Sequence, residues 1–277
     1  MNNNKMEIII LKLGGSLITE KNKPLSINEK IIKDSIEQII KSKKKVILVH
    51  GGGSFGHPTA KKYDLSDGKK DNIESQIYGL TETHYNMTKL NSFIINSFLE
   101  KNYPAIEIQS SSIFKNNSTQ ISKHSIEIIE DFLDLGIIPI LYGDIVLDDT
   151  KTFSILSGDE IIFKLCEKLM KYTILKVIFA ADIDGIYIGE KDGSTHLASK
   201  IPFEELKNLS LANLGNKIDV TNGIKGKLEQ IRKISQLGIP VEIINGTKPN
   251  LIYKSLNNEK IKSTFIEPIE KEMMGIK

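Results

Sequence analysis

Two glycine-rich segments near the N-terminus carry residue types that suit the binding of phosphate groups. The first runs from Lys12 to Ser16 and the second from His50 to His57, and each follows a short apolar run typical of a strand. Glycine at the end of a strand lets the backbone approach a ligand closely and direct several N–H groups at one anion. A single Gly-Gly pair is more often a simple tight turn, but three consecutive glycines near Lys12 and His57 favour binding. Two such segments predict two phosphate-bearing groups that bind side by side.

Neither glycine-rich segment matches a common nucleotide-binding signature. The sequence contains no G-x-x-x-x-G-K-S/T of a P-loop, and no G-x-G-x-x-G ends its first expected strand. A dinucleotide-binding fold is therefore disfavoured. Arg232 is the only arginine, so a phosphate site in this chain must rely on lysine, histidine and backbone N–H groups.

Three further segments place charged residues where strands end or helices begin. Residues 157–160 open an expected helix, whose N-terminus carries partial positive charge and free N–H donors. Asp159 there is either a simple N-terminal charge or a carboxylate that holds catalytic lysines in place. Residues 181–187 follow an expected strand, and their two aspartates could contact a ribose, a metal ion or only a turn. Residues 219–227 present two lysines and two glycines as another helix begins.

The composition is that of an ordinary globular protein. The chain has 277 residues, 40% of them hydrophobic and 26% charged, with a formal net charge of +2. This balance gives no reason to expect a nucleic acid or a membrane as partner. No apolar run reaches the ~18 residues of a membrane span, and the N-terminus lacks the features of a signal peptide. The single cysteine, Cys166, excludes an intrachain disulfide, suits a cytoplasmic location and is expected to be a buried structural thiol.

Strand-like apolar runs alternate with stretches of helical periodicity over most of the chain. Strands are expected at residues 7–13, 45–50, 105–109, 137–142, 172–181 and 240–244, and helices at 27–43, 72–101, 125–135, 159–171 and 223–237. Residues 144–147 and 152–156 flank a polar turn and predict a β-hairpin. The repeated strand–helix order predicts an α/β fold with a mainly parallel central sheet, covered by helices on both faces. A soft boundary near residue 170 gives two lobes, 1–170 and 171–277, that share one sheet.

The ordered set of these segments resembles the amino acid kinase superfamily over about residues 7–265. The resemblance is carried by KLGGS (12–16), HGGGSFGH (50–57), GD (143–144), SGDE (157–160), ADIDGIY (181–187) and DVTNGIKGK (219–227). The run GGGSFGHP, together with Lys21 shortly after KLGGS, looks most like the isopentenyl phosphate kinase family, whose near neighbours are the fosfomycin kinases. The resemblance implies a three-layer αβα sandwich. Its N-terminal part would bind the phosphate acceptor and its C-terminal part would bind ATP.

The resemblance also implies roles for individual residues in the transfer of the γ-phosphoryl group of ATP to isopentenyl phosphate. Lysines would stabilise the transition state, Asp159 would orient Lys12, and His57 would contact the acceptor phosphate. The catalytic set is then Lys12, Lys21, His57 and Asp159. The ATP site would comprise Lys12, Gly14, Gly15, Ser16, Gly52, Asp182, Gly223, Lys225 and Lys227, and the acceptor site would comprise Gly51, Gly52, Gly53, Gly56, His57 and Gly158. Mg²⁺ would arrive with ATP, held chiefly by phosphates and water, because no dedicated carboxylate cage is evident.

Several points stay open at the level of sequence. Asn222 stands where the family usually has the first glycine of a Gly-Gly pair, and either Lys225 or Lys227 could contact the ATP phosphates. Residues 77–87 could form an apolar wall for a five-carbon tail or could be ordinary core. Family analogy favours a homodimer.

Two alternative functions compete with the kinase of isopentenyl phosphate. A kinase of the same fold could act on another small phosphate or phosphonate such as fosfomycin, and the slot near residues 77–87 would distinguish the two. A nucleotide-binding protein without turnover would retain ATP without consuming it. The presence of the lysines and of His57 argues against that last alternative.

Overall fold

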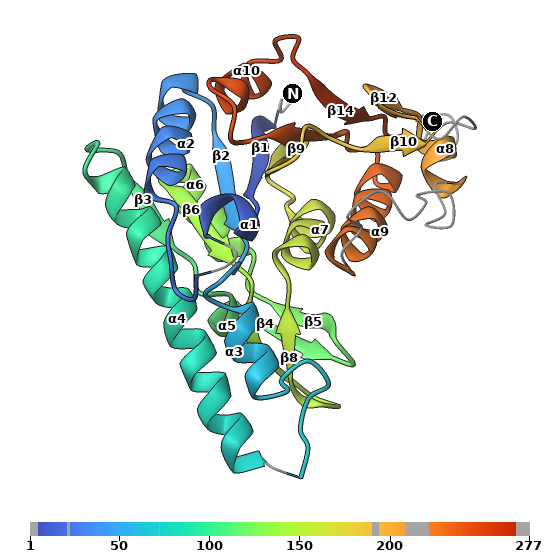
Figure 1. The fold of residues 1–277 in the computed structure, drawn as a ribbon. Coiled ribbons are helices and arrows are strands. Elements are labelled where there is room, and N and C mark those ends of the chain that lie inside the picture. Colours follow the sequence, from blue (N-terminus) through green and yellow to red (C-terminus); the bar gives the residue numbers. More distant parts are fainter. Residues whose placement is uncertain (1–4, 21–22, 72, 190–193, 209–221, 270–277) are drawn as a thin grey trace.

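The structure, a computed structural model, describes residues 5–20, 23–71, 73–189, 194–208 and 222–269, with only the backbone of 207–208 and 222–226. Within these residues the centre is a sheet of eight strands in the order β12-β14-β13-β9-β1-β2-β6-β3 (Figure 1). The strands are β1 (Met6–Leu13), β2 (Val46–His50), β3 (Ala105–Glu107), β6 (Ile138–Tyr142), β9 (Tyr172–Ala181), β12 (Lys200–Ile201), β13 (Val241–Asn245) and β14 (Ser263–Ile266). The strands from β13 to β3 run parallel, and β14 and β12 at one edge run in the opposite direction.

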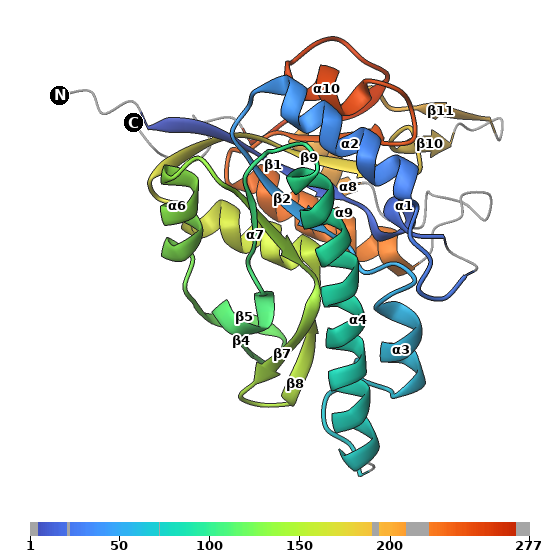
Figure 2. The ribbon, with the colours of Figure 1, turned by 90° about the vertical axis from the view of Figure 1, so that its left-hand side faces the viewer.

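Helices cover both faces of this sheet, because its strands carry apolar side chains on both sides. Alternate residues of β1 illustrate this: Ile9 and Leu11 pack into one core cluster, and Ile8 and Ile10 pack into the other. One face carries α1 (Gly15–Ile18), α2 (Glu29–Ser42), α4 (Ile73–Leu99) and α10 (Leu251–Leu256), and the other carries α6 (Glu127–Asp134), α7 (Gly158–Lys168), α8 (Phe203–Asn208) and α9 (Asn222–Gln236). Figure 2 shows these layers from the side. The three-layer αβα sandwich expected from the sequence is confirmed.

A smaller sheet lies below the carboxyl ends of β2 and β6 in the view of Figure 1. It contains β5 (Gln120–His124), β4 (Phe114–Asn117), β7 (Asp144–Asp148) and β8 (Thr152–Leu156) in that order. α5 (Ser110–Ile113) leads into β4, and α3 (His57–Lys62) packs on α4. A separate hairpin of β10 (Tyr187–Gly189) and β11 (Thr195–Leu197) follows β9. Over the described ranges, no helix has the length and apolar character that crossing a membrane requires.

The strands and helices expected from the sequence are all present, with shifts of a few residues at their ends. The expected hairpin is β7–β8, in which Asp144 pairs with Leu156 and Asp148 with Thr152. α4 is unbroken, although its sequence allowed breaks. Sequence analysis missed the β4–β5 hairpin, because residues 114–124 are mostly polar and show no clear alternation. It also missed short elements, namely α1, α3, α5, α8, α10, β10, β11, β12 and β14.

The Asp148 carboxylate fastens the turns of the two hairpins in the smaller sheet. It accepts N–H bonds from Ser118 (3.1 Å), Thr119 (2.7 Å), Thr150 (2.9 Å) and Lys151 (2.9 Å). Ser118 and Thr119 have φ angles of 49° and 67°, in a left-handed region that residues other than glycine rarely adopt. Burial alone would raise the pKa of Asp148, but these backbone donors hold it well below its usual range. The carboxylate therefore offsets the cost of an unfavourable turn.

We expect Asp148→Ala to lower the free energy of unfolding by about 2–4 kcal/mol, since it leaves several buried N–H groups without an acceptor. Because the pKa of Asp148 is depressed in the folded state, its contribution is present above the unfolded-state pKa of about 4 and is lost as pH falls toward the folded-state value. Urea unfolding of both proteins near neutral pH and in acid would measure this, with a smaller difference in acid.

Asp149→Ala is the matched control. Asp149 is the next residue along the chain, and its carboxylate forms an exposed ion pair with Lys115. Its loss should change the free energy of unfolding by less than about 1 kcal/mol. Equal losses in the two variants would contradict the role given to Asp148.

Candidate active site

The glycine turns and the charged segments meet at the carboxyl ends of the central strands. β1 ends at Leu13 and β2 ends at His50, and these two residues are partners in the sheet. β9 ends at Ala181 on the other side of β1. α7 begins against the same edge, because a Cβ atom on Gly158 would lie 3.4 Å from both the His50 carbonyl oxygen and Lys12 Cε. Ligands of open parallel sheets bind at this edge.

The two glycine turns pack backbone against backbone. A Cβ atom on Gly51 would lie 2.7 Å from the Gly15 nitrogen, and one on Gly15 or Gly53 would overlap the facing backbone. Gly53 also has a φ of 48°, which disfavours any side chain. Gly14 N donates to a carbonyl of β9 (2.9 Å) and Gly51 N to a carbonyl of β1 (3.0 Å), so both turns are fixed to strand ends. The contact between the turns therefore itself requires these glycines.

Backbone N–H groups at this edge remain available to a ligand. In the part of the chain that the structure describes, the following N–H groups have no protein acceptor: Gly15, Ser16, Gly52, Gly53, Gly158 and Asp159. The last two open α7, whose N-terminus also carries the partial positive charge of the helix dipole. Adjacent unpaired donors from three segments form a cradle suited to phosphate.

Three charged side chains form the centre of the site. Lys12 Nζ lies 2.5 Å from Asp159 Oδ1, and the two side chains are only 9% and 15% exposed. The ammonium groups of Lys12 and Lys227 lie 5.9 and 5.8 Å from the centroid of the Phe179 ring. Burial and the charge of Lys12 lower the pKa of Lys227, although Asp159 and Asp182 act in the opposite direction. Burial alone would raise the pKa of Asp159, but Lys12 and Lys227 hold it below its usual value. An anion can therefore compensate an excess of buried positive charge here.

His57 begins α3, directly after the second glycine turn. Its N–H donates to the Gly53 carbonyl (3.2 Å), and its ring is exposed. The protein atoms around the ring still remove part of its hydration, and this desolvation together with the charge of Lys12 lowers the pKa of His57 below 6.5. A Cβ atom on Gly52 or Gly56 would lie 2.9 or 3.2 Å from Met87 Sδ, so α4 supports this turn from behind.

The stretch 77–87 of α4 only partly fits the apolar wall expected from the sequence. Ile77, Tyr78 and Tyr85 are 54%, 63% and 59% exposed, so they face outward. Met87 is buried and contacts the second glycine turn. A separate apolar cluster beside α3 was not expected from the sequence, and its buried members are Ala60, Leu65, Ile145 and Phe153.

The segment 181–187 joins the first glycine turn to the far side of the sheet. Ser16 Oγ donates to Asp182 Oδ1 (3.1 Å). Asp184 accepts bonds from Lys262 Nζ (2.5 Å) and Asn245 Nδ2 (2.7 Å), and these two donors lower its pKa. Asp184 therefore anchors the segment on β13 and on the residue before β14, and Asp182 lies beside the glycine turn.

Three predicted site residues lie outside the described residues or are described by their backbone alone. Lys21 lies outside the described residues, and the structure gives only the backbone of Gly223 and Lys225 at the start of α9. Among the residues described, no group of three or more His, Cys, Asp or Glu side chains could hold a metal ion. Cys166 is only partly buried against a core cluster of the sheet, where a buried thiol was expected. Loss of hydration at this place raises the pKa of its thiol, in keeping with a structural residue.

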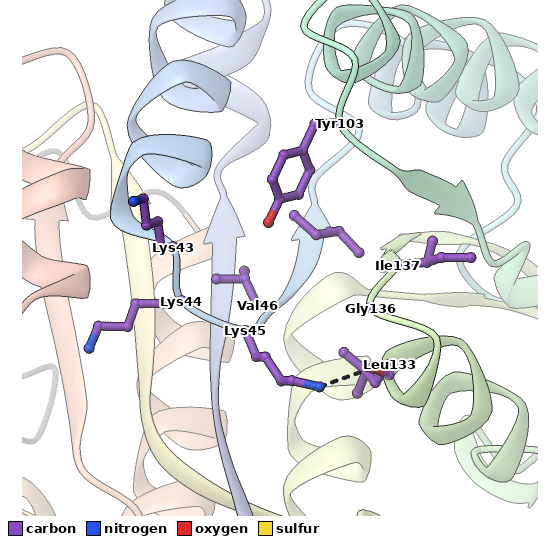
Figure 3. Close-up of a pocket in the computed structure, with 9 residues that line it drawn as sticks. Lys43, Lys44, Lys45, Val46, Tyr103, Leu133, Gly136 and Ile137 are labelled. Carbon is purple, nitrogen blue, oxygen red and sulfur yellow. Dashed lines mark hydrogen bonds between the residues drawn. The ribbon is translucent and has the colours of Figure 1, made fainter.

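A pocket of about 210 Å³ lies at the opposite edge of the sheet, where β2 and β6 begin. Its walls come from residues 43–46, Tyr103, Leu133 and residues 136–138 (Figure 3). Lys45 Nζ donates to the Leu133 carbonyl near the end of α6 (3.2 Å), which is a favourable place for a cation. No predicted site residue lines this pocket.

Sequence analysis did not single out Thr19, whose hydroxyl lies between the two glycine turns. Its Oγ1 donates to the Gly15 carbonyl (2.8 Å) and accepts a bond from Ser54 N–H (3.0 Å). The residue is 2% exposed, and its hydroxyl occupies the space that a Cβ atom on Gly53 would need. Thr19 therefore holds the two turns at a fixed separation. The only signal in the sequence is its place shortly after the first turn.

The fold and this edge of the sheet define a class of phosphate-handling α/β protein that lacks a P-loop. A sequence profile of the amino acid kinase family matches residues 7–245. The chain belongs to the amino acid kinase family.

Within that family the chain is similar to isopentenyl phosphate kinases. It is 38% identical over 262 residues to the isopentenyl phosphate kinase of Methanocaldococcus jannaschii, covering 91% of this chain and 96% of that protein. It is 33% identical over 270 residues to the one of Methanothermobacter thermautotrophicus, covering 94% and 98%. An X-ray structure of isopentenyl phosphate kinase matches with a TM-score of 0.80 at 30% identity, covering 94% of this chain and 99% of that one.

We expect Thr19→Val to lower kcat for phosphoryl transfer by about 10- to 100-fold, because small losses of alignment between bound groups are costly. KM values should change less, since each turn keeps its own N–H donors. Thr19→Ser keeps the hydroxyl and should restore most of kcat. Steady-state kinetics of the three proteins would measure this.

Ser35→Ala is the control for the loss of a buried hydroxyl. Ser35 Oγ donates to the Ile31 carbonyl within α2 (2.7 Å) and links no separate segments. Its kcat should equal that of the wild type. A Thr19→Ser variant as slow as Thr19→Val would count against the role of the hydroxyl.

Proposed function

We propose that this protein transfers the γ-phosphoryl group of ATP to isopentenyl phosphate and so forms isopentenyl diphosphate. The observation that carries the proposal is the contact between the two glycine turns, which sets unpaired N–H donors for two phosphates side by side next to Lys12. Similarity to isopentenyl phosphate kinases along nearly the whole chain supports the identity of the acceptor.

The acceptor phosphate supplies its own nucleophilic oxygen. A phosphate monoester has a second pKa of about 6 and is ionised near neutral pH, so no general base is needed. We assign His57 to the acceptor phosphate, to which an N–H group of its ring would donate a hydrogen bond. Burial and the charge of Lys12 lower the pKa of His57 in the ligand-free protein. The other residues assigned to the acceptor are Gly51, Gly52, Gly53, Gly56 and Gly158.

Lys12 would stabilise the charge on the phosphoryl group during in-line transfer. Phosphoryl transfer depends on positioning and on fixed charge near the moving group. The ion pair with Asp159 holds the Lys12 ammonium in one place. Lys21 is assigned a similar contact on the resemblance alone.

The nucleotide would bind along the first glycine turn and the residues beyond β9. The proximity of Asp182 to Ser16 and of Lys227 to the Phe179 ring supports this. The ATP site is then Lys12, Gly14, Gly15, Ser16, Gly52, Asp182, Gly223, Lys225 and Lys227. In this arrangement residues 171–277 form the nucleotide lobe and residues 1–170 the acceptor lobe.

The described residues fit a magnesium ion held chiefly by the ATP phosphates and water. Asp159 and Asp182 already bond to Lys12 and Ser16, which leaves no dedicated protein cage among the residues described. Bound with ATP, the ion would neutralise charge on the β- and γ-phosphates.

The apolar cluster beside α3 supports an acceptor with a hydrocarbon tail. Ala60 of that cluster lies one helical turn after His57, so buried apolar side chains lie near the assigned phosphate site. Family analogy also suggests a homodimer, and the single cysteine suggests a cytoplasmic location; both stay predictions.

Purified protein with ATP, Mg²⁺ and isopentenyl phosphate should consume ATP and yield isopentenyl diphosphate, with little turnover of fosfomycin tested in parallel. His57→Ala should lower kcat/KM for isopentenyl phosphate by about 10- to 100-fold, the effect of losing one hydrogen bond to a charged group. His57→Gln keeps an N–H donor and should lose less. His124→Ala, on the exposed strand β5, should behave as the wild type.

The same assay separates the alternatives. Turnover of fosfomycin alone would identify a phosphonate kinase of this fold. ATP binding without turnover of either acceptor would indicate a nucleotide-binding protein without catalysis.

Asp159→Asn should lower kcat by about 100-fold, because Lys12 loses the charge that positions it, while KM for ATP changes by less than about 5-fold. Glu160→Gln is the control. Glu160 accepts a bond from Ser157 N (2.8 Å) and caps α7, a role that glutamine can also fill. A wild-type kcat in Asp159→Asn would exclude the positioning role.

A further inference from the structure

His50, the last residue of β2, is a buried histidine to which the proposed function gives no role. It is 0% exposed and its ring stacks on Tyr142, with centroids 5.2 Å apart. Its Nδ1 lies 3.1 Å from the carbonyl oxygen of the next residue, Gly51. Its Nε2 lies 3.3 Å from the Asn91 side-chain amide of α4. The ring is thus held on both nitrogens directly behind the second glycine turn.

These contacts define the protonation of the ring. A carbonyl oxygen only accepts hydrogen bonds, so Nδ1 must carry the proton that points at Gly51. Burial lowers the pKa of His50 to about 4, although its bonds to Gly51 and Asn91 act in the opposite direction. The ring is therefore neutral near pH 7, and Nε2 bears a lone pair that needs a donor.

Asn91 supplies that donor when its side-chain amide is turned so that Nδ2, and not Oδ1, faces His50. Its Nδ2 is fully buried and has no partner, and its Oδ1 lies beside His50 Nε2. The two ends of an amide are assigned from the hydrogen-bond network, and a half-turn brings Nδ2–H onto the Nε2 lone pair. The orphaned donor is then satisfied, and the Nδ1–H form of His50 is fixed.

We propose that His50 is a positioning residue that sets the direction of the Gly52 N–H group in the acceptor site. A trans peptide is planar, so its N–H points opposite to its carbonyl. The Nδ1–H bond holds the Gly51 carbonyl toward the core and so turns Gly52 N–H outward, where it has no protein acceptor. This inference rests on the proposed function, in which Gly52 N–H binds phosphate.

A side-chain bond is needed here because the peptide joins two glycines. Glycine adopts positive and negative φ with similar ease, so the backbone alone does not hold one orientation of the Gly51–Gly52 peptide. Gly51 N donates to the Leu13 carbonyl (3.0 Å) and the Gly52 carbonyl accepts from Phe55 N (2.9 Å), which fixes the groups on either side. His50 fixes the one peptide between them.

The tautomer is tested directly in the full chain by long-range ¹⁵N–¹H NMR of the histidine rings. We expect His50 to show a protonated Nδ1 and an unprotonated Nε2, unchanged between about pH 6 and pH 8. His124, on the exposed strand β5, provides the internal reference. A protonated Nε2 or an averaged pattern would overturn the proposal. This measurement needs no variant and no turnover.

Two variants then test the consequence for phosphate binding. Asn places its amide near the position of Nδ1 and Gln near that of Nε2, and both remove the ring stacked on Tyr142. His50→Asn should keep kcat within about 5-fold of the wild type, and His50→Gln should lower it by about 10- to 100-fold with KM for ATP little changed. Equal losses in the two variants would overturn the proposal.

The Gly52 amide signal separates this inference from the proposed function. Isopentenyl phosphate should shift the Gly52 amide proton downfield in the wild type and in His50→Asn, and not in His50→Gln. A wild type without turnover would contradict the proposed function, while the ring pattern would still decide the state of His50. An unshifted Gly52 amide in an active wild type would overturn the inference alone.

Discussion

The contact between two backbones, without side chains in between, is the constraint on which this site depends. Gly15, Gly51 and Gly53 lie so close together that a single Cβ atom at any of them would enter the facing turn. The turns therefore inherit the spacing of the neighbouring strands β1 and β2, which is ~4.8 Å in any sheet. That is also the scale of two phosphates whose reacting atoms are ~3–3.5 Å apart. A rigid sheet thus sets a distance that flexible loops could not hold.

The positive and negative charges of the side chains at the centre of the site do not balance. Lys12 and Lys227 are both largely buried, and Asp159 compensates only part of their charge. Buried unpaired charge is unfavourable in the free protein. A polyanion that binds at this centre removes that cost. Part of the affinity for a phosphate ligand therefore comes from unfavourable electrostatic free energy in the free protein.

The sequence predicted the layers and the main sheet because strands buried on both faces leave long apolar runs, as in residues 7–13 and 172–181. It also indicated the glycine turns and Asp159, which the structure brings to one edge. It could not reveal Thr19 or the tautomer of His50, because their roles arise from contacts across the fold. The β4–β5 hairpin escaped notice since its turn is stabilised by Asp148, which is distant in sequence.

The order of strands has a consequence for how the chain folds during synthesis. β1 precedes every other described strand in the sequence, yet it lies in the middle of the sheet, between β2 and β9. Its pairing with β9 joins Met6 to Tyr172, so one edge of β1 has no partner until more than half of the chain has left the ribosome. An apolar strand with an open edge is prone to pair with other chains. The nascent N-terminal half therefore exposes an unpaired apolar strand edge, and completion of β9 covers that edge.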